Sequence, residues 1–549
     1  MTLQAKEDKP IPEETKRIAR AAFPKGNGYM KLRDELDTVY RDEFFADLFP
    51  QVGQLAESPG RLALITVLQF AEGLSDRQAA DAVRSRIDWK YMLGLELGDA
   101  GFDYTVLSEF RSRLLAGNAE GRLLDQLLEV FKAHKLIKER SRQRTDSTHI
   151  EAAVRRMNRL EKVGETLRYA LNELARIEPE WIQTRLPADW YLRYATRIEG
   201  YRLPREEAEQ QKLAKQIGED GRQLLEWVHT QGTQEIRVNK GVEILRRVWV
   251  QEYYQETGDI SWRGPGDTPP SEVRIDSPYD PEARYGEKRG QGWVGYKIHW
   301  TETCEEDAPH VIVQVATTSA AQPDFAVIPE IHQELATKDL LPGEHLVDKG
   351  YMNIRQVLVA ENIYHIQTIG YPMPSSSWQA KAQKGFDLPS FSIDWEGCRV
   401  TCPLQRTSHS WRNSKDDQNE PVIRVEFSPR DCNPCLQRCN CTQSKQGGRK
   451  MTLRPQLEHM ALQRLRQEVK TDAFKAIYRK RSGIEGTLSQ GIRAFDLRQA
   501  RYIGRAKVHL QHIASAAALN LARVFAWLSD VPLATTRISH LTSLSPSVG

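Results

Sequence analysis

Several features that would identify whole classes of protein are missing from this 549-residue sequence. Charge of one sign is not in surplus, because 77 basic residues face 74 acidic ones and leave a formal net charge of +3. Bulk charge therefore does not point to nucleic acid, and any basic surface must be local. With 40% hydrophobic and 28% charged residues, the composition excludes a largely disordered chain and is typical of a globular protein.

Long hydrophobic runs are also missing. The N-terminus contains no apolar segment of the kind that secretory signals need. The most apolar stretch near the C-terminus, residues 513–528, is interrupted by Asn520 and Arg523, so it is too short and too polar to span a membrane. We interpret it as a core helix and expect a cytoplasmic protein with no membrane partner.

Cysteine is scarce outside one segment, since six of the seven cysteines lie between Cys398 and Cys441. In a cytoplasmic protein such residues are typically thiols or metal ligands rather than disulfides. Close pairs separated by a loop suit tetrahedral zinc, although free thiols or a degraded zinc module would leave the same pattern. The predicted structural zinc ligands are Cys402, Cys432, Cys435 and Cys439, with Cys398 in reserve.

The length predicts several structural parts, because one simple core rarely grows this large. Strand-like and helix-like segments alternate between about residues 293 and 369, which is typical of an α/β sheet. The predicted parts are a loose arm at 1–27, a helical domain at 28–135, an α/β domain at 136–530 with a helical insertion at about 154–270 and a cysteine-rich insertion at about 371–455, and a flexible tail at 531–549.

The helical domain contains a pattern shared by DNA-binding modules and ordinary bundles. An apolar helix is predicted at 61–74, and Ser75 with Gln78 forms a capping box that opens a second helix. Helix, short turn and capped helix outline a helix-turn-helix. The second helix and the residue after it carry Arg77, Arg84 and Arg86. From this pattern alone we favour the bundle.

Three acidic residues occupy positions that suit a metal site. Asp146 lies in a predicted strand at 141–152, Asp348 ends a predicted strand at 345–348, and Glu485 lies on a predicted helix. Carboxylates at strand ends face the sheet edge where α/β proteins place ligands. Mg²⁺ prefers oxygen ligands, and two such ions can activate water and stabilise the leaving oxygen of a phosphodiester.

Each acid also has a purely structural interpretation. Asp146 could cap a turn, and Asp348 could accept backbone N–H groups after its strand. Glu485 could pair with Arg481, its i,i+4 neighbour on a helix. Taken singly, each acid favours this simpler interpretation, so the metal site depends on the three acids occurring together.

The motifs around these acids resemble those of bacterial insertion-sequence DDE transposases. The matching motifs are TDSTH around Asp146, HLVDKGY around Asp348, and Tyr478-x2-Arg481-x3-Glu485. The last of these resembles the subgroup with a Y-x2-R-x3-E signature. The segment at 280–299 and the helical part at about 40–120 are similar to the same family, so the resemblance covers most of residues 40–530. It implies that the helical domain at 28–135 is a DNA-binding domain.

The resemblance implies an α/β fold, α+β overall, with an RNase H-like mixed-sheet catalytic core. Asp146 and Asp348 would lie on adjacent central strands and Glu485 on a following helix, and together they would hold two Mg²⁺ ions, with Mn²⁺ as a substitute. The acids are separated by 202 and 137 residues, so both gaps must contain insertions.

The resemblance also implies contacts with DNA phosphate. Tyr478 and Arg481 match signature positions that contact phosphate near the scissile bond, and we add Lys349 beside the second aspartate. The family signature continues with a lysine six residues after the glutamate, where this sequence has Ile492 followed by Arg493. Between residues 478 and 507, eight basic residues face two acids, a local surplus that suits a helix along a phosphate backbone.

The function that follows is a bacterial, nucleoid-associated DNA transposase. It would bind the terminal inverted repeats of its element and target DNA as a homodimer or a higher synaptic complex, and it would cleave strands through hairpin ends. Two alternatives remain: a catalytically silent or domesticated DNA-binding protein, and an RNase H-like nuclease that never joins strands.

Overall fold

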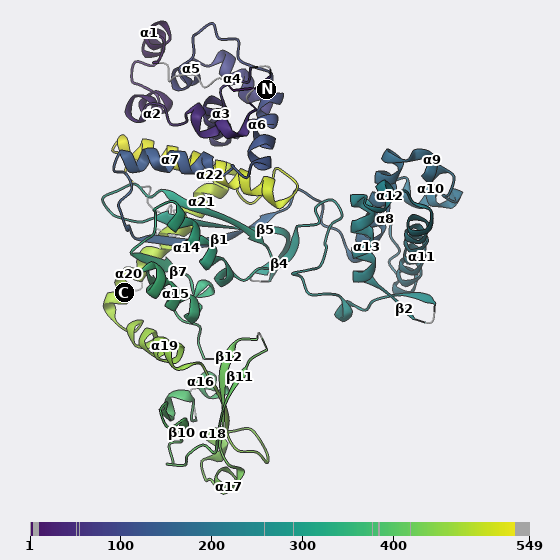
Figure 1. Cartoon of the computed structure of the whole chain (residues 1–549), viewed down its shortest axis with the longest axis vertical. Coiled ribbons are helices and arrows are strands. Elements are labelled where there is room, and N and C mark those ends of the chain that lie inside the picture. The colour runs from purple at the N-terminus through teal and green to yellow at the C-terminus, as the bar shows by residue number, and fades with distance from the viewer. Residues whose placement is uncertain are drawn as a thin grey trace, which may run out of the picture. The chain divides into compact units, whose positions relative to one another are not determined.

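The protein has a mixed α/β fold, as predicted (Figure 1). The computed structural model describes residues 2–3, 10–50, 52–53, 55–256, 258–288, 290–375, 377–382, 385–417 and 419–532. Residues 533–549 of the predicted tail lie outside this range. Within the described residues, no helix is long and apolar enough to cross a membrane.

The N-terminal region is helical, and it includes a helix where a loose arm was predicted. Its helices are α1 (Glu13–Ala22), α2 (Gly28–Leu36), η1 (Asp42–Leu48), α3 (Pro59–Glu72), α4 (Asp76–Ser85), α5 (Ile87–Leu93), α6 (Thr105–Ala116) and α7 (Arg122–Ala133). In α1, Thr15 is buried and its hydroxyl donates to the carbonyl of Leu95 at 2.8 Å. This tertiary contact fixes a polar segment that has little apolar pattern of its own. Helix α3 is buried on nearly every side and forms the centre of the region.

The helix-turn-helix outline is present, and its arginines contact the protein itself. The capping box forms at Ser75, as predicted. The Arg84 guanidinium donates to two backbone carbonyls. That of Arg86 lies 2.6 Å from the carboxylate of Asp88. Arg77 lies over the ring of a tyrosine, 4.7 Å from its centroid. These internal contacts favour the bundle interpretation of this helix pair.

The central sheet has the strand arrangement of an RNase H-like core, as predicted. Its strands are β1 (Gln143–Glu151), β4 (Arg284–Lys288), β5 (Gln291–Thr303), β6 (Ile312–Ser319), β7 (Glu344–Val347) and β8 (Gln367–Ile369). They are ordered β4-β5-β1-β7-β8, and β6 also pairs with β5. Strands β4 and β6 are antiparallel to β5, whereas β7 is parallel to both β1 and β8.

Helices connect the later strands. They are η4 (Asp324–Val327), α14 (Ile328–Thr337), η5 (Lys349–Tyr351) and α15 (Ile354–Tyr364). Strand β8 is short and begins only at Gln367, because α15 continues to Tyr364.

The helical insertion has a hydrophobic core of its own. Its elements are α8 (Arg159–Ile177), α9 (Pro179–Gln183), α10 (Ala188–Tyr194), η2 (Gly200–Arg202), α11 (Glu207–Gln231), α12 (Gln234–Arg237), α13 (Lys240–Glu252), β2 (Tyr253–Glu256), β3 (Asp259–Trp262) and η3 (Pro265–Asp267). Buried Trp190 and Trp249 belong to this core. Gly221 of α11 allows Trp249 to approach, since a Cβ there would lie 2.0 Å from the indole ring.

The cysteine-rich insertion consists of short strands and short helices. Its elements are α16 (Trp378–Ala382), η6 (Leu388–Ser390), β9 (Ser392–Asp394), β10 (Arg399–Thr401), β11 (Ser410–Lys415), β12 (Pro421–Glu426), α17 (Pro429–Cys432), α18 (Arg438–Cys441) and β13 (Lys450–Leu453). Strands β11, β12 and β13 form an antiparallel sheet. A small core that includes Phe391, Val425 and Leu453 packs between these elements.

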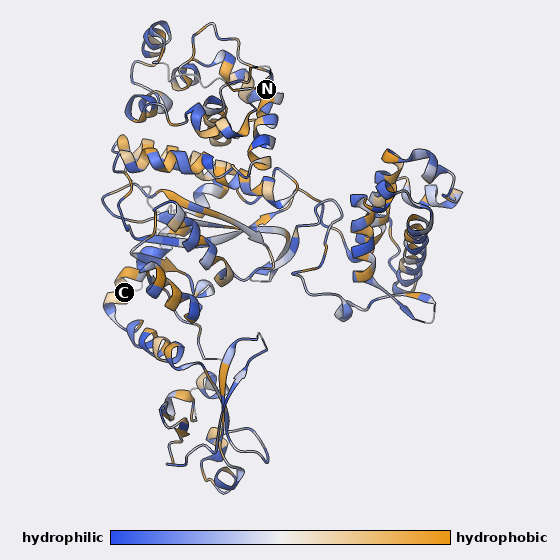
Figure 2. Cartoon of the chain, viewed as in Figure 1, coloured by the Kyte–Doolittle hydropathy of each residue, from blue (hydrophilic) through white to orange (hydrophobic). Residues whose placement is uncertain are grey.

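The C-terminal part returns to helix. Its elements are α19 (Gln456–Glu468), α20 (Asp472–Tyr478), η7 (Arg479–Ser482), α21 (Gly483–Phe495) and α22 (Arg505–Leu528). Helix α22 is the predicted core helix, and it packs against α3, α7 and β6. Figure 2 shows it as a largely hydrophobic segment.

The chain divides into two compact units. The first contains residues 1–141, 146–322 and 484–549, and the second contains residues 142–145 and 323–483. Strand β1 contributes residues to both units, as does the chain segment around the start of α21.

Candidate active site

Asp146 lies within β1 and is half-buried between the buried residues Thr145 and Ser147. Its Oδ1 accepts the backbone N–H of Ser147 at 2.8 Å. The residue therefore lies in a fixed strand rather than in a turn. A carboxylate in a strand has little freedom in its backbone, which suits a ligand whose direction must be defined.

Asp348 directly follows β7 and begins the short helix η5. Its Oδ1 accepts the backbone N–H of Lys349 at 2.7 Å, so the residue acts as an N-cap. The parallel register pairs Thr145 of β1 with Val347 of β7. Each of these two residues directly precedes one of the aspartates, although the aspartates are 202 residues apart in the sequence.

Glu485 lies in the first turn of α21, and its side chain is exposed. The segment before it is fixed to β1, because the Arg144 guanidinium donates to the carbonyl of Lys480 at 2.5 Å. Gly483 lies so close to this guanidinium that a Cβ on it would be 2.0 Å from Nη1. Contacts within the second unit thus hold Thr145 and Val347, which directly precede the two aspartates, and Gly483, which lies two residues before Glu485.

The acids themselves are divided between the units, since Asp146 and Glu485 belong to the first and Asp348 to the second. Among the described residues, no group of three His, Cys, Asp or Glu side chains stands at the distances of a metal site. The magnesium site at these three acids therefore stays a prediction.

An aromatic cluster surrounds the predicted phosphate contacts. Tyr478 stacks on Phe474 with ring centroids 5.7 Å apart, and it meets Tyr371 edge-on at 4.7 Å. The Arg481 guanidinium lies over the same Tyr478 ring, 5.9 Å from its centroid. The cluster packs against Leu346 of β7, so the basic segment that follows α20 begins from a rigid base.

Two further predicted phosphate contacts have exposed side chains. Lys349 follows the second aspartate at the start of η5, and Arg493 lies in the last turn of α21. Ile492 stands where the family signature has a lysine, and its side chain is half-buried. A cation is thus available one residue beyond the signature position.

A pair of buried histidines escaped the sequence analysis. His345 of β7 contacts the Thr145 hydroxyl at 2.7 Å through Nε2 and contacts His332 Nε2 of α14 at 2.9 Å through Nδ1. Burial lowers the pKa of His332 to about 4 and that of His345 well below its usual value, with the neighbouring His332 a second cause for His345. The only signal in the sequence was a histidine inside an apolar strand.

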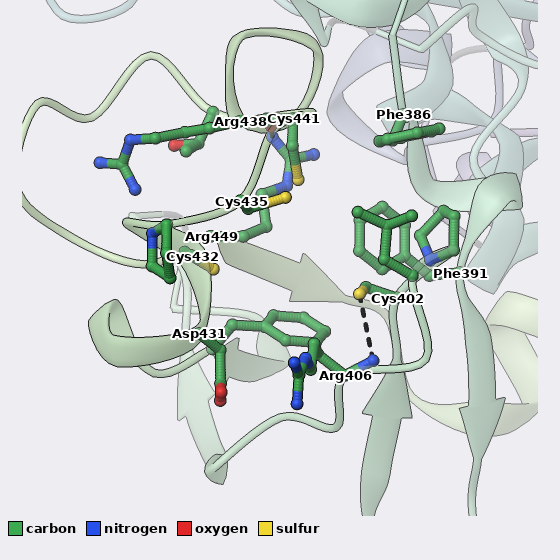
Figure 3. Close-up of a pocket in the computed structure, with 15 residues that line it drawn as sticks. Phe386, Phe391, Cys402, Arg406, Asp431, Cys432, Cys435, Arg438, Cys441 and Arg449 are labelled. Carbon is green, nitrogen blue, oxygen red and sulfur yellow. Dashed lines mark hydrogen bonds between the residues drawn. The ribbon is translucent and has the colours of Figure 1, made fainter.

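The cysteines meet at a cavity of about 300 Å³ in the insertion (Figure 3). Three of the four predicted ligands line it, namely Cys402, Cys432 and Cys435. Cys439 is exposed and is not among the lining residues, whereas Cys441 is. The sequence spacing could not distinguish these two, because both lie on the short helix α18.

Comparisons with known proteins identify two parts of the chain. A family model for the transposase DDE domain matches residues 401–525, and a model for the transposase domain DUF772 matches residues 17–113. The first range includes Glu485 and the cysteine cluster, while Asp146 and Asp348 lie in neither range. No curated protein and no solved structure matches the chain. Two transposase models thus match separate parts of one chain, on either side of an RNase H-like sheet in the sequence, and together they support an insertion-sequence DDE transposase.

Proposed function

We propose that this transposase binds the terminal inverted repeats of its element and cuts and joins DNA strands at Asp146, Asp348 and Glu485. One observation carries the proposal. Strand register and the bond from Arg144 to Lys480 hold the residues that precede all three acids within one compact unit. Acids far apart in the sequence are thereby attached to a common support.

The donor chemistry of these residues fits divalent magnesium. All three side chains are carboxylates, which are the hard oxygen ligands that Mg²⁺ and its substitute Mn²⁺ prefer. Bound Mg²⁺ would supply an activated water and would stabilise the leaving oxygen of the phosphodiester. The carboxylates of half-buried Asp146 and of Asp348, the N-cap of η5, would point in fixed directions. Exposed Glu485 on α21 would supply the third carboxylate.

The basic residues near Glu485 would position the DNA. Arg481 would contact a phosphate oxygen near the scissile bond, with its guanidinium held over Tyr478. Lys349 and Arg493 would contact flanking phosphates from exposed positions. The 3′-hydroxyl left by the first cut would attack the opposite strand to form a hairpin end and would later attack target DNA. Two ends must be held together, so a homodimer or a larger synaptic complex would carry out the reaction.

Precise excision tests this function. The gene with its native flanking DNA is placed on a plasmid, and loss of the segment is compared for wild type, Glu485→Gln and Asp472→Asn. Asp472 is a matched control, because it is an exposed acid on the neighbouring helix α20 and pairs only with Lys475 in the described residues. We expect excision in wild type and Asp472→Asn and a loss of about 100-fold or more in Glu485→Gln, the order by which an enzyme slows when one group that stabilises charge in the transition state is removed.

The other outcomes separate the alternatives. Excision in Glu485→Gln at the wild-type level would remove Glu485 from the proposed site. Cleavage of element ends by purified protein without any joined product would favour a nuclease. Binding to the inverted repeats without cleavage would favour a silent DNA-binding protein.

A further inference from the structure

The cavity in the cysteine-rich insertion is lined by sulfur from three separate segments. Cys402 follows β10, Cys432 ends α17 and Cys435 lies three residues later, while Cys441 ends α18. Figure 3 shows the four cysteines arranged around the same space. Six cysteines lie in this part of the chain, yet the fold selects four of them for one cavity and leaves Cys398 and Cys439 exposed.

The cavity also contains cationic hydrogen-bond donors that have no acceptor. Arg438 Nη1 and Arg449 Nε are buried and have no hydrogen-bond partner among the described residues. Another nitrogen of each guanidinium donates to a backbone carbonyl. Arg449 Nη1, for example, donates to the carbonyl of Cys441 at 2.6 Å. A buried donor without a partner costs about 1–3 kcal/mol, and more when it is charged. Such donors indicate that anionic acceptors belong in this cavity.

A backbone donor already points to one of the sulfurs. The N–H of Arg406 donates to Cys402 Sγ at 3.3 Å, drawn as the dashed line in Figure 3. The same turn is closed by the N–H of Cys402, which donates to the carbonyl of Arg406 at 2.8 Å, and Gln405 adopts a left-handed conformation with φ of 61°. Hydrogen bonds to sulfur stabilise the thiolate form over the thiol, as in the outer shell of a metal site.

We propose that Cys402, Cys432, Cys435 and Cys441 bind one structural Zn²⁺ ion as four thiolates. Each thiol gives up its proton on binding, so the ion and its ligands carry a net charge of −2. The guanidiniums of Arg438 and Arg449 offset that charge and gain sulfur acceptors. No three ligand atoms among the described residues stand at metal distances, so binding draws the sulfurs inward and folding of the module becomes coupled to the metal.

The choice of Cys441 over Cys439 gives a sharp test. The full-length protein, purified without chelator, is measured for zinc and iron by mass spectrometry, beside Cys441→Ser and Cys439→Ser. We expect about one zinc per chain in wild type and in Cys439→Ser, and a loss of most of it in Cys441→Ser. Wild-type protein without zinc, or zinc lost through Cys439→Ser and retained in Cys441→Ser, would overturn the proposal.

A second measurement uses wild-type protein alone and does not depend on how a variant folds. Native protein is alkylated with and without a zinc chelator, and the modified cysteines are located by peptide mapping. The four ligands should react slowly until chelator is added, whereas exposed Cys398 and Cys439 should react at once in both cases. Equal reactivity of the four with and without chelator, or disulfides among them under native conditions, would contradict the site. Neither readout depends on excision, so the result is independent of the proposed transposition.

Discussion

Arg144 is a single residue on which the arrangement of the acids depends. It lies on β1 two residues before Asp146, it is only 5% exposed, and it bonds to the segment that leads into Glu485. It has no catalytic chemistry to offer and acts by holding the backbone of η7. In the sequence it is one more arginine in a basic motif, with nothing to mark it as a positioning residue.

Two substitutions test this contact from both sides. Arg144→Met removes the bond, and Gly483→Ala introduces a Cβ that would displace the guanidinium. Both variants should lose about 10-fold or more in strand cleavage while still binding element ends, since a small misplacement of a reacting group is costly. Gly486→Ala is the matched control, because nothing lies within 4 Å of a Cβ there. Full cleavage in both variants would show that the contact has no role in positioning.

The residues of the candidate site were predictable to different degrees. The three acids stood out because their three motifs occur together in one chain, which the sequence alone can show. Cys441 could not be distinguished from Cys439, because their order in space is decided by how α18 turns toward the cavity. Contacts such as the one between Arg144 and Lys480 join residues 336 positions apart, and no local pattern specifies them.

Among the elements, β1, β7 and α14 are joined by the buried histidine pair. His332 and His345 face each other at 2.9 Å, so only one proton can lie between the two rings. Both are neutral in the folded state, since burial lowers the pKa of each. The unfolded chain exposes both rings, where a histidine pKa is about 6.5.

This pair predicts that acid weakens the second unit. Between pH 6.5 and pH 4 the unfolded state binds more protons than the folded state, so the free energy of unfolding falls as the pH is lowered. For His332 alone the loss reaches roughly 3 kcal/mol at the lower limit, at about 1.4 kcal/mol for each unit of pKa difference. The denaturant midpoint should fall steeply with pH in wild type and less steeply in His332→Gln. Exposed His409→Gln should follow wild type, and a His332→Gln profile as steep as wild type would rule out this cause.

The elements themselves were predicted best where burial imposes a period. The first part of strand β5 alternates between more and less buried side chains, so its pattern was readable, whereas its last six residues are all buried. Strand β11, with the sequence SWRNSK, has mostly exposed or half-buried side chains and is held by its register with β12. Strand β11 forms because its backbone pairs with β12, and such pairing leaves no alternation of apolar and polar residues in the sequence.

For the whole molecule, the C-terminal helix is as important as the sheet. Helix α22 contacts α2, α3 and α7 of the N-terminal region as well as β6. Asn520 is fully buried on this helix, where its Oδ1 accepts the N–H of Ile312 at 2.7 Å and its Nδ2 donates to the carbonyl of the same residue at 2.8 Å. The apolar stretch in the sequence predicted a core helix here, but it could not say which surfaces that helix would cover.

Asn520→Leu should therefore loosen both regions at once. The change leaves two buried backbone groups of Ile312 without these partners, at about 1–3 kcal/mol for each group. We expect faster hydrogen–deuterium exchange in β6, in α22 and in α3. Asn172→Leu, an exposed asparagine on α8, should leave exchange in these elements unchanged. Faster exchange confined to β6 would mean that α22 does not connect the two regions.

The contact between chain ends has a consequence for protein synthesis. The Lys31 ammonium donates to the carbonyl of Leu528 and to the Ser529 hydroxyl, so α2 is completed by contacts with the end of α22, which is made much later. Domains usually fold in the order in which they leave the ribosome. Here the apolar surfaces of α3 and α7 that face α22 must wait until α22 has been translated. A chain that stops before residue 505 therefore leaves its N-terminal helices incomplete, which makes the fragment a natural target for proteolysis.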